Sequence, residues 1–200
     1  MIQYGFVGDI HGCIRQLHEV IGEAKHIATH LVFLGDYVNR GAHSREVIEY
    51  LVELNKEIPS TFLSGNHDQS LLRSLEGPGF DEFLRMGGAS TVRSYIEALP
   101  QPDVLSQFRS SVPPEHLIFL NNLQPIFDAS GVFATHELTS LGSARSKFQV
   151  CGHAPRPTIT PLISDRAALI DTGCGTLSGG RLTCFFWPSR QWIQSTPWDE

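Results

Sequence analysis

Three short apolar runs, each followed by glycine and polar residues, constrain the fold of this chain most strongly. They read QYGFVGDIHG, HLVFLGDYVNRG and STFLSGNHD, at residues 3–12, 30–41 and 60–68. Short runs rich in Val, Ile, Phe and Leu that are bounded by Gly are typical of buried strands. Each run therefore predicts a strand that ends where its polar residues begin.

Helical periodicity fills the two intervals between these strands. The apolar residues at helical spacing are Ile14, Leu17, Val20 and Ile21 in the first interval, and Val47, Ile48, Leu51 and Val52 in the second. Strand and helix thus alternate over the first 70 residues, which predicts parallel strands joined by crossover helices. In such sheets ligands bind at the carboxyl ends of the strands, and all three polar clusters fall there.

The whole chain, residues 1–200, predicts a single α/β domain, because this length supports one sizeable core. The middle, about residues 69–124, has mainly helical patterns that prolines divide. A strand-like stretch with Gly131 at an expected turn position follows it, and the tail is rich in short β-like runs. Residues 182–194, LTCFFWPSRQWIQ, predict one arm of a hairpin.

Composition restricts the partners and the location of the chain. The net charge is −6 and the 15 Lys and Arg are scattered, so we expect no nucleic-acid partner, which requires clustered basic residues. We expect no membrane partner and no signal peptide, since no apolar run is long enough and Met1 leads directly into a strand-like segment. The 4 cysteines lack zinc-site spacing and indicate reduced thiols in a cytoplasmic protein. Nothing in the sequence indicates the oligomeric state.

The first polar cluster, GDIHG, places an aspartate and a histidine two residues apart. Residues with this spacing point the same way in a strand or its immediate extension, so Asp9 and His11 are expected to converge beyond the strand end. Carboxylate oxygen and imidazole nitrogen together suit a divalent transition metal. A single such pair is a weak indication, because it also occurs by chance.

Four further residues of the same chemical types follow other strand-like runs. They are Asp36, Asn66, His136 and His153. Helix caps and turns use Asp and Asn routinely, and they explain one or two of these positions well. They explain a series of strand ends poorly, so the pattern favours a metal site.

The ordered set GDIHG, GDYVNRG, GNHD, a later strand-end His and then GH resembles the calcineurin-like metallophosphoesterases. It is most similar to the bacterial branch that holds PPP-type serine/threonine phosphatases and symmetrical diadenosine tetraphosphatases. The similarity runs from about residue 4 to residue 175, counting IDTGC at 170–174, and the motifs are specific only together. This resemblance implies an α/β fold, a four-layer α/β/β/α sandwich with a dinuclear metal site at the strand ends.

The resemblance also implies two divalent metal ions as cofactors. Carried over by position, Asp9, His11 and Asp36 hold the first ion, and Asp36 bridges to the second. The remaining ligands of the second ion are Asn66, His136 and His153. Manganese is the expected metal, and Fe, Zn, Ni or Mg are the alternatives, because nitrogen and oxygen ligands of this kind accept several divalent ions.

The same resemblance assigns catalytic roles to the residues beside these ligands. His67 is expected to be the general acid, Arg40 to bind the phosphate with its planar fork of donors, and Asn66 to contact the substrate. Related protein phosphatases have an aspartate where this chain has Asn39, and that aspartate orients and charges the histidine. The amide oxygen of Asn39 is expected to accept a hydrogen bond from His67, without the charge that favours an imidazolium.

A second departure from the family pattern lies between His136 and His153. The family commonly has a longer segment there, which carries another phosphate-binding arginine. Arg145 is the natural candidate for this catalytic and substrate-binding role, and the alternative is an exposed loop charge. A short segment would also leave a more open site.

Together these features predict a hydrolase, a metal-dependent phosphoesterase that cleaves phosphomonoesters by attack of a metal-bridging hydroxide. A phosphorylated protein is the first expected substrate, as for a serine/threonine protein phosphatase. A nucleotide is the alternative, as for a symmetrical bis(5'-nucleosyl)-tetraphosphatase (Ap4A hydrolase), and Asn39 favours it because those enzymes tend to lack an acid there. A third interpretation is a non-catalytic phosphate-binding or scaffold protein, and the presence of every expected metal ligand argues against it.

Overall fold

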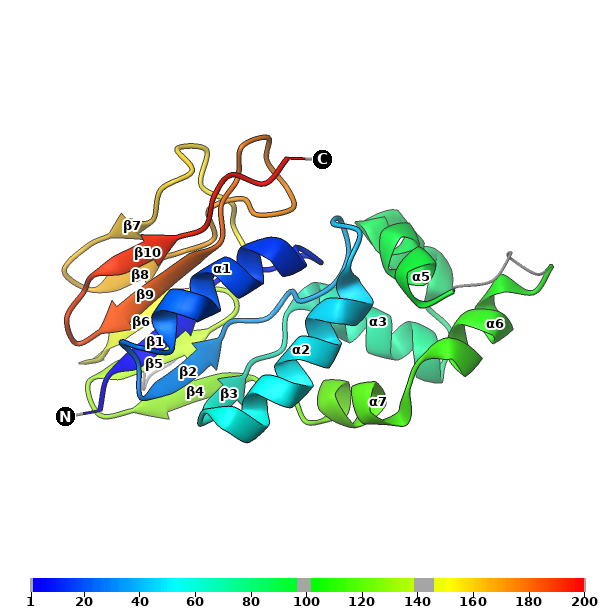
Figure 1. Ribbon diagram of the computed structural model, residues 1–200, viewed down its shortest axis with the longest axis horizontal. Coiled ribbons are helices and arrows are strands. Elements are labelled where there is room, and N and C mark those ends of the chain that lie inside the picture. Colours follow the sequence, from blue (N-terminus) through cyan, green and yellow to red (C-terminus); the bar gives the residue numbers. More distant parts are fainter. Residues whose placement is uncertain (1, 97–101, 139–145, 200) are drawn as a thin grey trace.

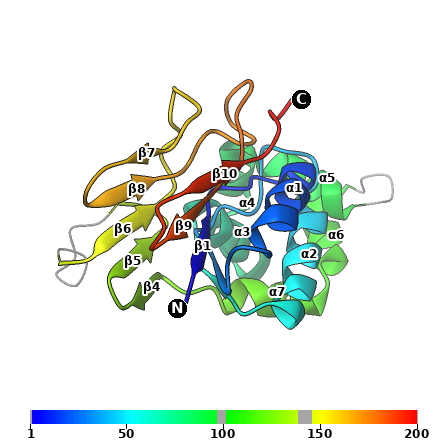
Figure 2. The same cartoon turned by 60° about the vertical axis from the view of Figure 1, so that its left-hand side comes forward.

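The computed structural model describes residues 2–96, 102–138 and 146–199. Two sheets of five strands each pack face to face, and helices cover the outer face of the first sheet (Figures 1 and 2). The predicted α/β sandwich of two sheets is therefore confirmed. All described helices lie between residues 14 and 121, so the described residues supply no helical layer over the outer face of the second sheet.

The first sheet contains the three strands predicted from the apolar runs. Its order is β10-β9-β1-β2-β3. The strands are β1 (Tyr4–Val7), β2 (His30–Phe33), β3 (Ser60–Phe62), β9 (Thr183–Trp187) and β10 (Trp192–Gln194). Helices α1 (Ile14–Ala24) and α2 (Ser44–Glu57) join β1, β2 and β3, which are parallel, so the predicted β-α-β-α-β order is confirmed.

The tail hairpin differs from its prediction. Strands β9 and β10 are antiparallel neighbours, and β9 also pairs with β1. The segment 182–194 thus contains both arms of the hairpin, although only one arm was expected there. The reason is a tight turn inside the segment, where the Phe186 backbone exchanges hydrogen bonds with Arg190 and Gln191.

The second sheet has three parallel strands flanked by one antiparallel strand at each edge. Its order is β4-β5-β6-β8-β7. The strands are β4 (Ile126–Ala129), β5 (Val132–Thr135), β6 (Phe148–Cys151), β7 (Leu162–Ile163) and β8 (Ala167–Leu169). Strands β5, β6 and β8 run parallel, and β4 and β5 form a hairpin whose turn contains Gly131 at φ 79°, as predicted.

The middle of the chain is helical, with one kink that bears on the site. Its elements are α3 (Asn66–Glu76), α4 (Phe80–Phe83), the π-helical segment η1 (Leu84–Gly88), α5 (Ala89–Tyr95), α6 (Val104–Ser111) and α7 (Pro114–Asn121). Gly87 has a φ of 89° and interrupts the helical geometry inside η1. Glycine adopts this left-handed conformation without the steric cost that a Cβ would bring.

Two hydrophobic cores share the strands of the first sheet. Phe6 and Val32 point into the core between the sheets, while Val7, Leu31 and Phe33 point into the core beneath the helices. Alternate side chains of a strand face opposite sides of its sheet, and here both sides are buried. This explains why β1 and β2 read as continuous apolar runs rather than as alternating polar and apolar residues.

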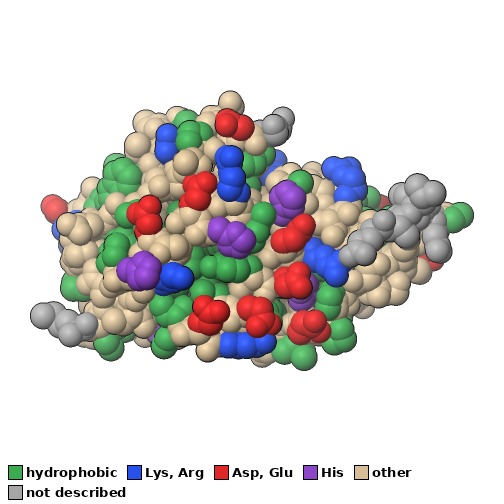
Figure 3. All heavy atoms as spheres, viewed as in Figure 1, with side chains coloured by type: hydrophobic (Ala, Val, Ile, Leu, Met, Phe, Trp, Pro, Cys, Tyr) green, Lys and Arg blue, Asp and Glu red, His purple; other side chains and the backbone are tan. Residues whose placement is uncertain are grey.

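The surface and the thiols add two further observations. On the face shown in Figure 3, Lys and Arg side chains are interspersed with Asp and Glu side chains. None of the helices in the described ranges combines the length and the hydropathy that crossing a membrane requires. All four cysteines are free and buried.

Candidate metal centre

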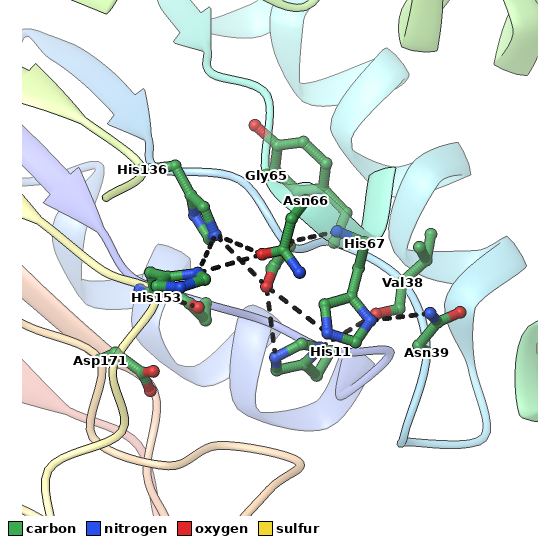
Figure 4. A network of polar contacts seen from close by, with 12 residues as sticks. His11, Val38, Asn39, Gly65, Asn66, His67, His136, His153 and Asp171 are labelled. Carbon is green, nitrogen blue, oxygen red and sulfur yellow. Dashed lines mark hydrogen bonds and ion pairs between the residues drawn. The ribbon is translucent and has the colours of Figure 1, made fainter. Parts of the chain in front are cut away.

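The expected site residues lie where parallel strands end, and both sheets contribute to one cluster (Figure 4). Asp9 and His11 follow β1, Asp36, Asn39 and Arg40 follow β2, Asn66 and His67 begin α3 after β3, and His136 and His153 follow β5 and β6. The carboxyl ends of neighbouring parallel strands meet at one edge of a sheet. Face-to-face packing of the two sheets then brings the two sets of residues together.

Unusual backbone conformations are concentrated in these loops. The non-glycine residues with positive φ in the described ranges are His11, Asp36, Asn39, Arg40, His153, Ile159 and Arg190. The first five of these are expected site residues. Such conformations cost about 1–3 kcal/mol each and persist only where the surrounding structure fixes them. The fold therefore holds these side chains in positions that a relaxed loop would not adopt.

One aspartate without a predicted role, Asp68, fixes the loop that carries Asp36. Its Oδ2 accepts hydrogen bonds from the backbone N–H groups of Asp36 (2.7 Å) and Gly65 (2.9 Å), and its Oδ1 accepts from that of Tyr37 (2.9 Å). Burial and then the neighbouring Asp36 raise the pKa of Asp68 to about 7. The available sequence signal was its third position in the helix that GNHD begins, where a carboxylate can accept a hydrogen bond from the backbone N–H of the residue before the helix.

Two histidines have their tautomers fixed by backbone carbonyls. The Nδ1–H of His11 donates to the Val38 carbonyl (3.0 Å), and the Nδ1–H of His136 donates to the Leu34 carbonyl (3.0 Å). A carbonyl only accepts, so each Nδ1 carries the proton. Burial lowers the pKa of His11 to about 3 and that of His136 to about 4, and both rings are neutral near pH 7. Each Nε2 consequently presents a lone pair, which is the form that binds a metal.

Both of these lone pairs face the carboxylate of Asp36. The Oδ2 of Asp36 lies 3.7 Å from the Nε2 of His11 and 3.5 Å from the Nε2 of His136. The Oδ1 of Asn66 lies 3.0 Å from the Nε2 of His136, and the Nδ1 of His153 lies 3.1 Å from each of these two atoms. A lone pair and a carboxylate oxygen at these separations repel one another unless a cation lies between them. The donor set therefore fits metal binding.

Asp36 is shared between two groups of ligand atoms. The groups are His11, Asp36 and His67, and Asp36, His136 and His153, and within each the ligand atoms lie within 4.8 Å of one another. Neutral imidazole nitrogens and carboxylate oxygens suit divalent transition metals. A carboxylate has two oxygens, so Asp36 has the position and the chemistry to contact two cations.

Buried carboxylates surround this cluster, and their pKa values are raised because burial disfavours their charged forms. Burial, followed by Asp171 and Asp36, raises the pKa of Asp9 well above its ordinary value. Burial also raises the pKa of Asp36 to about 7 and that of Asp171 to about 6. Nearby cations favour the ionised forms of such groups, which is a second reason that divalent ions fit here.

Asp9 lies beside the cluster without joining either group. Both of its carboxylate oxygens are near the backbone N–H of His153, which donates to them at 3.2 and 3.1 Å. The third member of the His11 group is His67, whose Nε2 lies 4.0 Å from the Asp36 carboxylate. The assignment of Asp9 to the first metal stays a prediction. Asp171 accepts a hydrogen bond from the Gly173 backbone (3.0 Å) and so fixes a turn.

Asn39 contacts His67, but through its nitrogen. The Nδ2–H of Asn39 donates to the Nδ1 of His67 (2.8 Å) and also lies near the Met86 carbonyl (3.5 Å). Its Oδ1 accepts from the Thr91 hydroxyl (2.8 Å), so the expectation that this oxygen serves His67 is wrong. Partners about fifty residues away in the sequence fix the amide. His67 then carries its proton on Nε2, and burial followed by Arg40 lowers the pKa of His67 to about 4.

Arg40 is a positive side chain that acts on these groups. Its charge lowers the pKa values of His11, Asp36 and His67. The side chain is exposed and forms no hydrogen bond or ion pair with any described residue, so its donors are available to an anion. Arg145 lies outside the described residues, and its role stays a prediction.

Comparison with known proteins agrees with this geometry. Residues 2–169 match the calcineurin-like phosphoesterase family. The asymmetrical bis(5'-nucleosyl)-tetraphosphatase PrpE of Oceanobacillus iheyensis is 23% identical, over 94% of this chain and 89% of its own. A catalytic subunit of protein phosphatase 2A from Dictyostelium discoideum is 38% identical, over 45% of this chain and 30% of its own.

A solved structure described as a candidate diadenosine tetraphosphatase shares the fold. Its TM-score is 0.69 at 20% sequence identity, and the match covers 99% of this chain and 95% of that one. The family match spans most of the chain and includes the loops that build the cluster. The chain therefore belongs to the calcineurin-like phosphoesterases, a family of hydrolases.

Proposed function

We propose that this phosphoesterase holds two divalent metal ions, manganese by preference, on either side of Asp36. One observation carries the proposal: the unprotonated Nε2 atoms of His11 and His136 face the same carboxylate oxygen of Asp36, at 3.7 and 3.5 Å. Asp9 completes the first set of ligands. Asn66 and His153 complete the second set, and their polar atoms lie 3.1 Å apart.

The residues around the ions would bind the substrate and donate a hydrogen bond to its leaving group. Bound ions of this kind supply positive charge to the phosphoryl oxygens and acidity to a water molecule. Arg40, with its free donors, binds the same phosphoryl group. His67 directs its Nε2–H to the leaving-group oxygen, because Asn39 occupies its Nδ1 (2.8 Å). This arrangement cleaves a P–O bond and leaves a phosphate product with an alcohol or a second phosphate.

Phosphomonoesters, including phosphoproteins, are the first substrate class, and a dinucleoside polyphosphate is the second. The second class is supported by how much of this chain each relative matches. The tetraphosphatase relative matches 94% of it, whereas the protein phosphatase relative matches 45%. The motifs resemble the symmetrical tetraphosphatases, whereas this relative is named asymmetrical. Symmetrical cleavage of diadenosine tetraphosphate gives two molecules of ADP, and asymmetrical cleavage gives one ATP and one AMP. Analysis of the products therefore distinguishes the two modes. The free cysteines support a cytoplasmic location.

The decisive experiment compares metal-loaded and chelator-treated protein on three substrates. These are p-nitrophenyl phosphate, a phosphoserine peptide and diadenosine tetraphosphate. We expect cleavage that depends on Mn²⁺. Asp36→Asn is expected to abolish both activity and binding of the metal pair, because the amide loses the charge and one oxygen that the two groups share.

The matched control is Asp103→Asn, the same substitution at an exposed helix cap far along the sequence from the cluster. It is expected to keep full activity and the full metal content. Retention of full activity by Asp36→Asn would overturn the two-metal assignment. If metal bound to the unaltered chain but none of the three substrates was cleaved, the non-catalytic scaffold interpretation would replace the enzyme proposal.

A further inference from the structure

Two cavities beside the cluster share the same three residues. The first, about 470 Å³, lies between the start of α1 and the loop after β2, and Arg15, Arg40, Trp198 and Asp199 are among its lining residues. The second, about 490 Å³, is lined by Arg40, Gly175, Thr176, Ser178, Trp198 and Asp199. Arg40, Trp198 and Asp199 therefore border both cavities. A substrate whose phosphate binds Arg40 can place its remaining part in these spaces.

The C-terminal segment is fixed where it borders the cavities. The Trp198 backbone N–H donates to the Gly180 carbonyl (2.7 Å), and the Arg15 guanidinium donates to the Pro197 carbonyl (3.0 Å). The backbone N–H and the hydroxyl of Thr196 also donate to the Glu19 carboxylate (2.7 and 2.9 Å). The segment is thus tied to α1 on one side and to the loop before β9 on the other. Trp198 is held in place before a substrate arrives.

The Trp198 indole is suited to stacking. The side chain is half-buried, packs against the helical core and lines both cavities. Its indole N–H forms no hydrogen bond with any described residue. A fixed and partly exposed aromatic face binds flat π systems well, and stacking on a nucleobase contributes about 1–3 kcal/mol.

Two arginines in the first cavity suit more than one phosphate. Arg40 and Arg15 both line it, together with Asp199, and the Arg15 side chain is 61% exposed. The Arg15 ion pair with Glu19, at 3.9 Å, is long and exposed, so it competes weakly with an anion. A phosphomonoester offers one phosphate to Arg40 and leaves Arg15 with its present partners, Glu19 and the Pro197 carbonyl. A chain of phosphates provides an anion for each arginine, and its binding must overcome the charge of Asp199.

The second cavity has a polar atom without a partner. Thr176 lines this cavity, and its hydroxyl is buried and has no hydrogen bond in the described structure. Buried polar groups in folded proteins usually have a partner. A ribose hydroxyl or a base amino group next to Trp198 would provide one once the Thr176 side chain rotates toward the cavity.

We propose that Trp198, Arg15 and Thr176 form the subsite that binds the nucleoside and outer phosphates of a nucleoside polyphosphate substrate. The proposal deepens the phosphoesterase function above and rests on it. It selects the nucleotide class over the phosphoprotein class. An extended peptide with one phosphate uses Arg40 but gives Arg15 no anion and Trp198 no flat ring.

The test measures kcat and KM of Mn²⁺-loaded protein on diadenosine tetraphosphate and on glycerol 3-phosphate, a phosphomonoester without an aromatic ring. Trp198→Ala is expected to raise KM for the dinucleotide about 5- to 160-fold, the range that lost stacking implies, and to change glycerol 3-phosphate kinetics less than about 2-fold. Trp198→Phe should recover most of the loss. Arg15→Gln, which keeps a donor for Pro197 but removes the charge, is expected to raise the same KM about 3- to 10-fold.

The matched control is Trp192→Ala. Trp192 is exposed on β10 and lines neither cavity, so its loss should leave both substrates unaffected. Thermal melting of each variant establishes that it is folded. Equal losses on both substrates in Trp198→Ala would make Trp198 a support of the site's structure and overturn the proposal, and so would an unchanged KM for the dinucleotide.

The proposed function and this inference fail in different ways. If the unaltered protein cleaves p-nitrophenyl phosphate but not diadenosine tetraphosphate, the phosphoesterase function stands and the nucleotide subsite is wrong. If it cleaves neither although it is metal-loaded, the phosphoesterase function fails and the subsite fails with it. A third outcome is that the protein cleaves a phosphoserine peptide faster than diadenosine tetraphosphate and that Trp198→Ala slows cleavage of the peptide. The indole would then bind a peptide side chain, and the nucleoside subsite would be overturned.

Discussion

At the scale of single residues, the chemistry of the site depends on carboxylates that bind no substrate. Asp68 accepts three backbone hydrogen bonds, from Asp36, Tyr37 and Gly65, and is almost fully buried. Each of these N–H groups would otherwise be buried without a partner. The geometry of Asp36, on which both groups of ligand atoms depend, is therefore set by its neighbour's carboxylate.

Replacement of Asp68 by asparagine tests this role. The amide keeps one acceptor oxygen and turns an N–H group toward a backbone N–H, so at least one buried donor loses its partner. We expect Asp68→Asn to lower the free energy of unfolding by about 2–3 kcal/mol and to weaken metal binding. Urea denaturation and calorimetric titration with Mn²⁺ measure the two effects.

The control for this substitution is Asp103→Asn. Asp103 also accepts a backbone hydrogen bond at a helix start, from Ser106 (3.0 Å), but it is exposed, and asparagine caps helices as well as aspartate does. Its denaturation midpoint should stay unchanged. An Asp68→Asn protein with the unaltered stability and metal affinity would show that the carboxylate is not needed to hold the loop.

At the scale of secondary-structure elements, the π-helical segment η1 packs against two candidate catalytic residues, Asn39 and Arg40. The Met86 carbonyl lies near the Asn39 amide (3.5 Å), and Gly87 lies against the Arg40 side chain. A Cβ added at Gly87 would be 3.4 Å from the Cδ of Arg40, and the glycine has a φ of 89°. Glycine thus allows both the kink of the helix and the close approach of the arginine.

We expect Gly87→Ala to affect stability and substrate binding together. The left-handed conformation costs an alanine about 1–2 kcal/mol, and the added methyl group would contact the arginine stem at 3.4 Å and restrict its movement. Denaturation should show that loss, and steady-state kinetics should show a higher KM for p-nitrophenyl phosphate with a smaller change in kcat.

The matched control is Gly22→Ala in α1, where an added Cβ meets nothing within 4 Å. Alanine is expected to stabilise this helix by about 0.5–1 kcal/mol and to leave KM unchanged. If Gly87→Ala behaved like Gly22→Ala in both measurements, the packing of η1 against Arg40 would have no functional consequence.

At the scale of the whole molecule, the metal centre connects the two sheets. Asp36 and Asn66 follow strands of the first sheet, and His136 and His153 follow strands of the second. The Asn66 amide oxygen and the Asp36 carboxylate lie 3.0 and 3.5 Å from the unprotonated Nε2 of His136. Without a cation, their repulsion opposes the packing of the sheets at this edge.

Metal binding is therefore expected to stabilise the fold as a whole. A ligand at 100 times its dissociation constant adds about 2.7 kcal/mol, so Mn²⁺ should raise the free energy of unfolding by at least this order. A chelator should remove the increment. Urea denaturation with and without Mn²⁺ measures it, with p-nitrophenyl phosphate turnover as a check on loading.

Asp36→Asn should lose this increment, and Asp128→Asn on the exposed β4 should keep it. A metal increment of equal size in both variants would mean that the stabilising ion binds elsewhere. Because this comparison measures folding, it tests the location of the metal independently of any substrate.

Local patterns in the sequence were enough to predict the strand and helix order of the first 70 residues and the ends of the strands that carry the site. Apolar periodicity and bounding glycines are properties of short segments, and strands β1, β2 and β3 obey them. The ordered motifs pointed to the family in the same way. The hairpin of β9 and β10 was only half predicted, since its turn lies within a run that reads as a single β-like stretch.

Only the tertiary structure decided the contacts between segments that are distant in the sequence. Thr91 orients the Asn39 amide from 52 residues away, and Asp68 fixes the Asp36 loop from 32 residues away. The placement of Trp198 beside Arg40 likewise depends on the C-terminal segment packing against α1. The sequence by itself determined which chemical groups are present and at which strand ends they lie. Their hydrogen-bond directions, tautomers and cavities depend on long-range packing, and local patterns carry no information about it.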